Sequence, residues 1–124
     1  MSWGGTMKCL LVNQTGNQIL AVYVNHNWES HNDAPDPNPT VEMAANGGIG
    51  FLINVGAGGS DDWSVAFTDM NGKYWYRSGK QCDVESEDYN SGQEVQVVLG
   101  SGGFSIQLPK SSSCNNNYYN TITP

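Results

Sequence analysis

Short apolar runs alternate with polar turns along most of this chain. Within these runs, apolar residues either recur at every second position or stand consecutively, and both patterns are typical of β-strands. No stretch keeps the three- and four-residue apolar spacing of a helix. The predicted strands are residues 7–13, 18–25, 40–44, 49–55, 63–69, 73–77, 94–99 and 104–108.

Short strands about ten residues apart, with turn residues between them, favour an all-β fold. We predict a single-domain antiparallel β-sandwich of about seven to eight strands, with a small β-barrel as the second choice. The sandwich domain is expected to span residues 1–110. Residues 111–124 are rich in Ser and Asn, so they are predicted to form a poorly ordered C-terminal tail.

The clearest single element is a hairpin inside the segment Gly56–Cys82. Two strand-like runs are joined by Met70-Asn71-Gly72, and Asn-Gly between alternating segments is a strong hairpin signal. This segment also holds two tryptophans and two tyrosines. A small protein that gathers aromatic residues around one hairpin is more consistent with binding than with catalysis.

A different pattern covers residues 25–39, where Pro35, Pro37 and Pro39 stand at alternate positions. Proline restricts the residue before it to extended conformations, so we predict a surface loop of about fifteen residues. Loops of that length in a compact domain are usually functional or disordered.

Charge narrows the classes of partner. The chain of 124 residues has a formal net charge of −7, and only 14% of its residues are charged. Nucleic acid and anionic lipid are poor partners, because both attract clustered Lys and Arg. Neutral or zwitterionic membranes and glycans remain as expected partners, together with a protein cofactor or a second copy of the chain.

The N-terminal sequence bears on localisation. No apolar run approaches 18 residues, and residues 1–9 lack the apolar core of a signal peptide. We therefore expect a protein that is cytoplasmic at synthesis, with any release following a route that needs no signal peptide. Met7 is an alternative start, in which case residues 1–6 are an added tag.

Three cysteines, Cys9, Cys82 and Cys114, match neither a metal-binding spacing nor a disulfide framework. They are interpreted as three unrelated thiols. The alternative is a Cys82–Cys114 disulfide that holds the Asn-rich tail, which would require an oxidising compartment.

No residue set predicts an enzyme. A serine in a Gly-x-Ser-x-Gly elbow is missing from the sequence. Asp61 and Asp62 are adjacent carboxylates, and adjacent positions on a strand point to opposite faces, so the two cannot easily act on one bond. We therefore predict no catalytic residues and no cofactor.

Two groups of side chains are candidate metal sites. His26 and His31, with Asp33 and Asp36 nearby, fit no zinc signature, so they are interpreted as solvated loop residues. An acidic segment could wrap calcium, but it lacks the glycine and the flanking helices of an EF-hand. Its carboxylates are Asp83, Glu85, Glu87 and Asp88. No metal is predicted at either group.

Aromatic residues give the better indication of a binding site. Trp28 lies in the proline-rich segment, and a loop tryptophan is either a lid on the core or a contact residue. Tyr74, Trp75 and Tyr76 follow one another on a predicted strand, so at least one of them faces outward. Exposed Trp and Tyr suit membrane interfaces, choline headgroups and sugar rings. We predict that Trp28 and the Trp75–Tyr76 pair form one binding rim, with Tyr74, Asp61 and Asp62 in the ligand-binding set.

One stretch of the sequence resembles the aegerolysins. The matching pattern is Gly-x-Ser-Asp, then Phe-x-Asp, then a glycine turn into Tyr-Trp and a following Cys. In this chain those residues are Gly58, Ser60, Asp61, Phe67, Asp69, Gly72, Tyr74, Trp75 and Cys82. The resemblance implies a small acidic β-sandwich that recognises membrane lipids such as sphingolipids, in some cases together with a larger pore-forming partner.

These observations together predict a non-enzymatic recognition protein. Its expected ligand is a membrane lipid or another cell-surface component, in the setting of a toxin or a defence system such as a cytolysin. A lectin-like carbohydrate-binding module is the first alternative. A small protein inhibitor or a self-assembling structural protein is the second.

Overall fold

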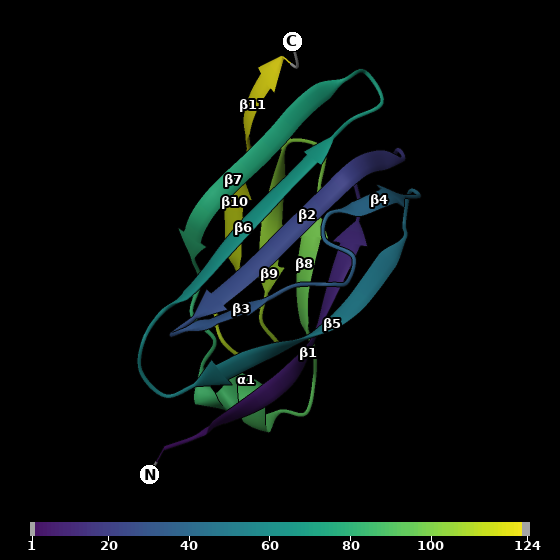
Figure 1. The fold of residues 1–124 in the computed structure, drawn as a ribbon. Helices are drawn as coiled ribbons and strands as arrows, with labels where there is room; N and C mark the ends of the chain where they lie inside the picture. Colours follow the sequence, from purple (N-terminus) through teal and green to yellow (C-terminus); the bar gives the residue numbers. More distant parts are fainter. Residues whose placement is uncertain (1, 123–124) are drawn as a thin grey trace.

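Two β-sheets packed face to face make up the computed structural model, which describes residues 2–122 (Figure 1). The predicted all-β sandwich is confirmed, and the sheets do not close into a barrel. The strands are β1 (Gly4–Asn13), β2 (Ile19–Trp28), β3 (His31–Asp33), β4 (Thr40–Met43), β5 (Gly48–Gly56), β6 (Asp61–Thr68), β7 (Lys73–Gln81), β8 (Val95–Leu99), β9 (Gly103–Gln107), β10 (Cys114–Asn117) and β11 (Tyr119–Ile122).

The core lies between the two sheets, where alternate residues of each strand point inward. In β6, for example, Trp63, Val65 and Phe67 are buried while Ser64 faces the other side. β1 and β8 follow the same period of two. This alternation is the pattern from which the strands were predicted.

The first sheet has the strand order β10-β9-β8-β1-β5, and the second has the order β11-β7-β6-β2-β3, with β4 also paired to β2. All pairs are antiparallel except β1 with β8, which is parallel. A parallel pair needs a long connection between its two strands. The alternation of apolar and polar residues within each strand does not reveal that two such distant segments pair.

The C-terminal segment differs from its prediction. Residues 114–122 are not a tail outside the sandwich, because β10 extends the first sheet and β11 extends the second (Figure 1). Tyr118, between these two strands, is buried among Phe67, Trp75 and Phe104. The chain therefore changes sheets at Tyr118 and covers one side of the core.

A disulfide joins Cys82, just after β7, to Cys114 at the start of β10, with 6.2 Å between their Cα atoms. The structure thus shows the pairing that was the alternative to three unrelated thiols. Cys9 is a buried free cysteine, and burial raises the pKa of its thiol, so this residue acts as an apolar core side chain.

The loop predicted over residues 25–39 is wrong for its first part. β2 continues to Trp28 and turns back into β3. The remaining proline-rich segment is attached to the edge of β2 by Asn38, whose amide group bonds both the N–H and the carbonyl of Val24. The asparagine side chain therefore substitutes for a neighbouring strand at that position.

The acidic segment after β7 contains one short helix, α1 (Ser86–Asn90), which was not predicted. Its Asp88 is buried and accepts hydrogen bonds from the backbone of Glu85, Lys110 and Ser111 and from the Ser111 hydroxyl. Burial alone would raise the pKa of Asp88, but these hydrogen bonds outweigh it and the pKa is lowered. This carboxylate holds the chain in place before β10 and is not a free calcium ligand.

Candidate functional site

Four tyrosines lie together on the solvent-facing side of the second sheet. Strand pairing aligns Tyr23, Ala66, Tyr76 and Tyr119 across β2, β6, β7 and β11. Tyr74 stands two positions before Tyr76 and points to the same side, and the two rings stack with centroids 5.4 Å apart. We call Tyr23, Tyr74, Tyr76 and Tyr119 the tyrosine face.

The tyrosine face combines aromatic rings with one cation. Tyr119 is 53% exposed, and its ring centroid lies 5.7 Å from that of Tyr76. The guanidinium of Arg77 lies 4.8 Å from the Tyr119 centroid, and its Nη1 donates a hydrogen bond to the carbonyl of Asn117. These two contacts hold the cation beside the rings, at the edge of the sheet.

A shallow hollow of about 190 Å³ opens in this face. Tyr23 lines it from β2, and Tyr74 and Tyr76 line it from β7, while Ala66 of β6 lies between them. Ala66 has only a methyl side chain and is 8% exposed, so it forms the floor of the hollow. Further lining comes from Ser64, Arg77 and Ser78.

The β6–β7 hairpin ends next to the tyrosine face. Asp69 stabilises its turn, because one carboxylate oxygen accepts the N–H groups of Asn71 and Lys73. Gly72 alone of the three turn residues has a positive φ, of 82°. That geometry matches a three-residue turn closed by a glycine, rather than the two-residue Asn-Gly turn.

Trp75 faces away from the tyrosine face, toward the core. Its ring packs edge-on against Tyr118, and its Nε1 donates a 2.9 Å hydrogen bond to Asp69. This bond lowers the pKa of Asp69, and the backbone N–H groups of Lys73 and Asn71 add to the effect. Trp75 therefore supports the hairpin from behind, while Tyr74 and Tyr76 face solvent.

Trp28 lies at the opposite end of the second sheet. It pairs with Asp61 at the start of β6, whereas Trp75 pairs with Phe67, six residues farther along that strand. Six strand residues span about 20 Å, so Trp28 and Trp75 lie about that far apart along the sheet. The predicted single rim of Trp28, Trp75 and Tyr76 therefore does not exist. The Trp28 ring stacks on His31, and its Nε1 donates to the carbonyl of Gly58.

Asp61 and Asp62 face opposite sides of β6, as adjacent strand residues must. Asp62 is partly exposed, at the Trp28 end of the sheet. Asp61 is buried, and its two carboxylate oxygens bond the His26 ring and the N–H of Val84. Asp61 thus has no surface from which to contact a ligand, and neither residue adjoins the tyrosine face.

Sequence reasoning missed a buried polar network around His26. Its Nδ1 lies 2.9 Å from Asp33 and its Nε2 lies 2.7 Å from Asp61, with all three residues buried. Asp33 also accepts the backbone and side-chain N–H groups of Asn54, which connects the second sheet to β5 of the first. The period of two in β2 could have revealed this, because His26 follows the buried Val22 and Val24.

The sequence predicts that His26 is a solvated loop residue. That prediction is wrong, because His26 lies on β2 and is buried. Both of its ring nitrogens are engaged by carboxylates, which leaves neither one for a metal. Among the described residues, no group of three His, Cys, Asp or Glu side chains could hold a metal ion. Within residues 2–122, none of the helical structure is long and apolar enough to span a bilayer.

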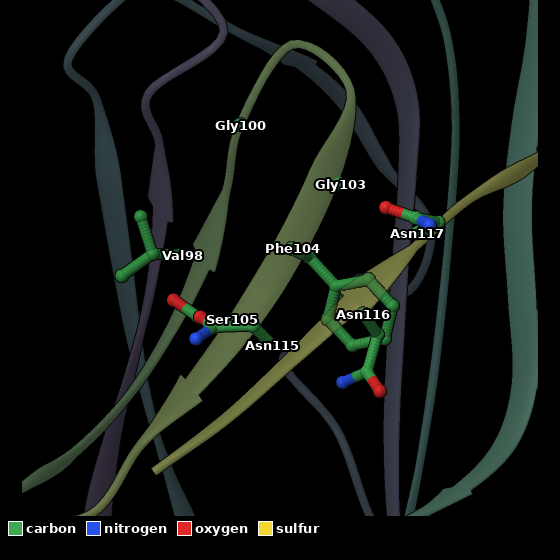
Figure 2. Close-up of a pocket in the computed structure, with 8 residues that line it drawn as sticks. All are labelled: Val98, Gly100, Gly103, Phe104, Ser105, Asn115, Asn116 and Asn117. Carbon is green, nitrogen blue, oxygen red and sulfur yellow. The ribbon is translucent and has the colours of Figure 1, made fainter.

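A second hollow, of about 350 Å³, lies on the first sheet (Figure 2). Val98, Ser105 and Asn115 align across β8, β9 and β10 on its outer side. Phe104 and Asn116 point to the other side of the same strands (Figure 2). The hollow offers amide and hydroxyl groups but no exposed aromatic ring.

Comparisons with known proteins were made for the whole chain. The chain matches no protein-family model and no curated protein. One similar solved structure is described as "NMR structure of the protein from Eubacterium rectale". It is 16% identical, the match covers 77% of each chain, and the TM-score is 0.45. This likeness carries no argument about function, and the aegerolysin resemblance stays a prediction.

Proposed function

We propose that this protein is a non-enzymatic recognition module that binds a zwitterionic membrane surface through the tyrosine face. The observation that carries the proposal is that tyrosines from three strands, β2, β7 and β11, gather on one side of the second sheet. Tyrosine places an apolar ring and a hydroxyl group in the same side chain, and it is enriched where membranes meet water.

Neighbouring apolar residues support a membrane as the partner. Met70, at the hairpin tip, is 59% exposed, and it precedes Tyr74 by four residues. Val41 of β4 is 76% exposed and lies at the same end of the sheet, because β4 and the end of β6 both pair with Leu20. Exposed apolar tips beside tyrosines suit shallow insertion into the headgroup region.

The charge distribution supports a zwitterionic rather than an anionic surface. The net charge of −7 repels anionic lipid, while the Arg77 guanidinium beside the tyrosines can meet a single phosphate. Binding of this kind depends on aromatic contacts, so raising the salt concentration should weaken it little, in contrast to phosphate-reading proteins.

Vesicle co-sedimentation tests this function. The protein should sediment with zwitterionic vesicles at both low and high salt, and much less with anionic vesicles. Tyr76→Ala should weaken sedimentation roughly tenfold or more, as for an aromatic hot spot. Gln107→Ala, on the exposed surface of the first sheet, is the matched control and should sediment like the unmodified protein. Failure to sediment with any vesicle would reject membrane recognition.

A lectin-like function is the second candidate, and the asparagine-lined hollow of Figure 2 favours it. Amide and hydroxyl groups such as those of Asn115 and Ser105 can bond sugar hydroxyls. A glycan array run beside the vesicle assay separates the two functions. Binding to glycans that is abolished by Asn115→Ala and unaffected by Tyr76→Ala would support the lectin.

A further inference from the structure

We propose that the hollow above Ala66 receives the trimethylammonium group of a choline headgroup. This inference rests on the proposed function, and it names the headgroup that the tyrosine face recognises. A quaternary ammonium cannot donate hydrogen bonds, so it is bound by aromatic rings that surround it. The hollow is lined by Tyr23 on one side and by Tyr74 and Tyr76 on the other.

The strand spacing sets a suitable width. Tyr23, Ala66 and Tyr76 are aligned on three neighbouring strands, so two strand spacings, or about 9.6 Å, separate the backbones of the two tyrosines. Cation–π attraction acts within about 6 Å of a ring centroid, so a cation held between the two rings can contact both. Ala66, which is 8% exposed, forms the floor of the hollow at this position, and a longer side chain would extend into it.

The groups next to the hollow complement the rest of the headgroup. A choline lipid carries its phosphate a few bonds from the ammonium, and Arg77 lines the same hollow. Arg77 is already held against Tyr119 and the Asn117 carbonyl, so its position costs little to fix on binding. Ser64 and Ser78 add hydroxyl groups to the lining that can donate to phosphate oxygens.

The net charge of the protein agrees with an ammonium group in the hollow and a phosphate beside Arg77. The protein is acidic, with a net charge of −7, which favours an ammonium group over a second anion near its surface. Arg77 is the one cation among the residues that line the hollow, so it matches a single phosphate. Together the rings and the guanidinium fit a zwitterion whose positive end lies over Ala66.

The test compares two headgroups that differ only in their methyl groups. Vesicles with the same acyl chains carry either phosphatidylcholine or phosphatidylethanolamine, and both lipids are zwitterionic. The protein should prefer phosphatidylcholine by roughly tenfold or more, because the smaller ammonium prefers water to the rings. Soluble phosphocholine should release the protein from the vesicles, whereas phosphoethanolamine should not.

Two variants locate the headgroup. Ala66→Leu fills the hollow without removing a tyrosine, and it should abolish the preference for phosphatidylcholine. Ala66→Ser keeps the hollow open and is the matched control, which should retain the preference. Melting curves of both variants establish that each is folded, and the comparison of headgroups on the unmodified protein does not depend on them.

The outcomes separate this inference from the proposed function. Equal binding to the two vesicles, or a preference that survives Ala66→Leu, would overturn the choline site and leave membrane recognition standing. Binding to neither vesicle would reject membrane recognition itself. Binding of soluble phosphocholine without vesicle binding would overturn the lipid as the source of the headgroup.

Discussion

At the scale of single residues, His26 is the centre of a buried polar network. Its ring lies between Asp33 and Asp61 and packs on Trp63, with ring centroids 4.4 Å apart. Trp63 in turn donates its indole N–H to the carbonyl of Cys82. Since each buried polar group of this network has a partner, the network stabilises one arrangement of the two sheets.

Replacing His26 should be strongly destabilising. In His26→Leu, Asp33 and Asp61 lose their shared partner inside the protein, and breaking a buried charged contact typically costs about 3–5 kcal/mol. Urea unfolding measures this loss. His31→Leu, five residues away and exposed, is the control; it removes only the stacking of His31 on Trp28 and should change stability far less than His26→Leu. Equal stability of the two variants would show that the network contributes nothing.

Single residues also show what a sequence can reveal of a site. Tyr74 and Tyr76 were predicted because neighbouring aromatic residues on a strand cannot all be buried. Tyr23 could have been placed beside them, since it alternates with the buried Val22 and Val24. Tyr119 could not, because it reaches the face only through pairing between β11 and β7, far apart in sequence.

At the scale of elements, the β6–β7 hairpin positions the tyrosines, and Asp69 links its turn to Trp75. The carboxylate bonds two backbone N–H groups and the indole at once. The tip that carries Met70 is therefore held by one side chain, at the point where the proposed membrane contact begins.

Acid should loosen this hairpin. Hydrogen bonds lower the folded-state pKa of Asp69 below its ordinary value of 3.8, so its stabilising effect is complete above about pH 4. The effect is lost as the pH falls through the lower folded-state pKa. The Trp75 indole N–H resonance should shift only below pH 3.8, and Asp69→Asn should remove that transition. A transition centred above pH 4 would contradict the assignment, and Asp62→Asn serves as the control.

The last two strands depend on a covalent link as well as on packing. The Cys82–Cys114 disulfide closes a loop with a sequence separation of 32 residues. Replacing both cysteines by serine should lower stability by about 3–4 kcal/mol, the amount expected from loop-closure entropy. Hydrogen exchange should become faster in β10 and β11 than in β1. Three free thiols in the denatured, unreduced protein would refute the link.

The elements also divide into those the sequence could predict and those it could not. Strands such as β6 and β8 alternate clearly, and they were predicted within a few residues. β3 and β10 consist mainly of Asn, together with His, Asp and Cys, and Asn and Asp are poor strand formers. They are strands because they pair with the preceding β2 and β9, while β11 pairs with the distant β7, and local propensity records none of these pairings.

At the scale of the whole molecule, the tyrosine face and the Trp28 region are two separate surfaces of one sheet. The sequence predicts that their aromatic residues meet. However, β2 and β7 run in the same direction on either side of β6, and Trp28 ends β2 whereas Trp75 lies near the start of β7. Trp28 instead packs over Gly56, where a side chain would collide with its ring. We therefore expect Trp28 to contribute to stability and the tyrosine face to contribute to binding.

Relaxation by a spin-labelled lipid tests this division most directly. Zwitterionic vesicles containing a headgroup-labelled lipid are added to the isotopically labelled protein, and the loss of each backbone amide signal is measured. If the tyrosine face contacts the membrane, the amide signals of Tyr74, Tyr76 and Tyr119, and of Met70 on the hairpin tip, should lose the most intensity. Signals of Trp28 and of Asn115 should persist. Strongest losses at Trp28 or Asn115, with the tyrosine signals unchanged, would contradict the proposed binding surface.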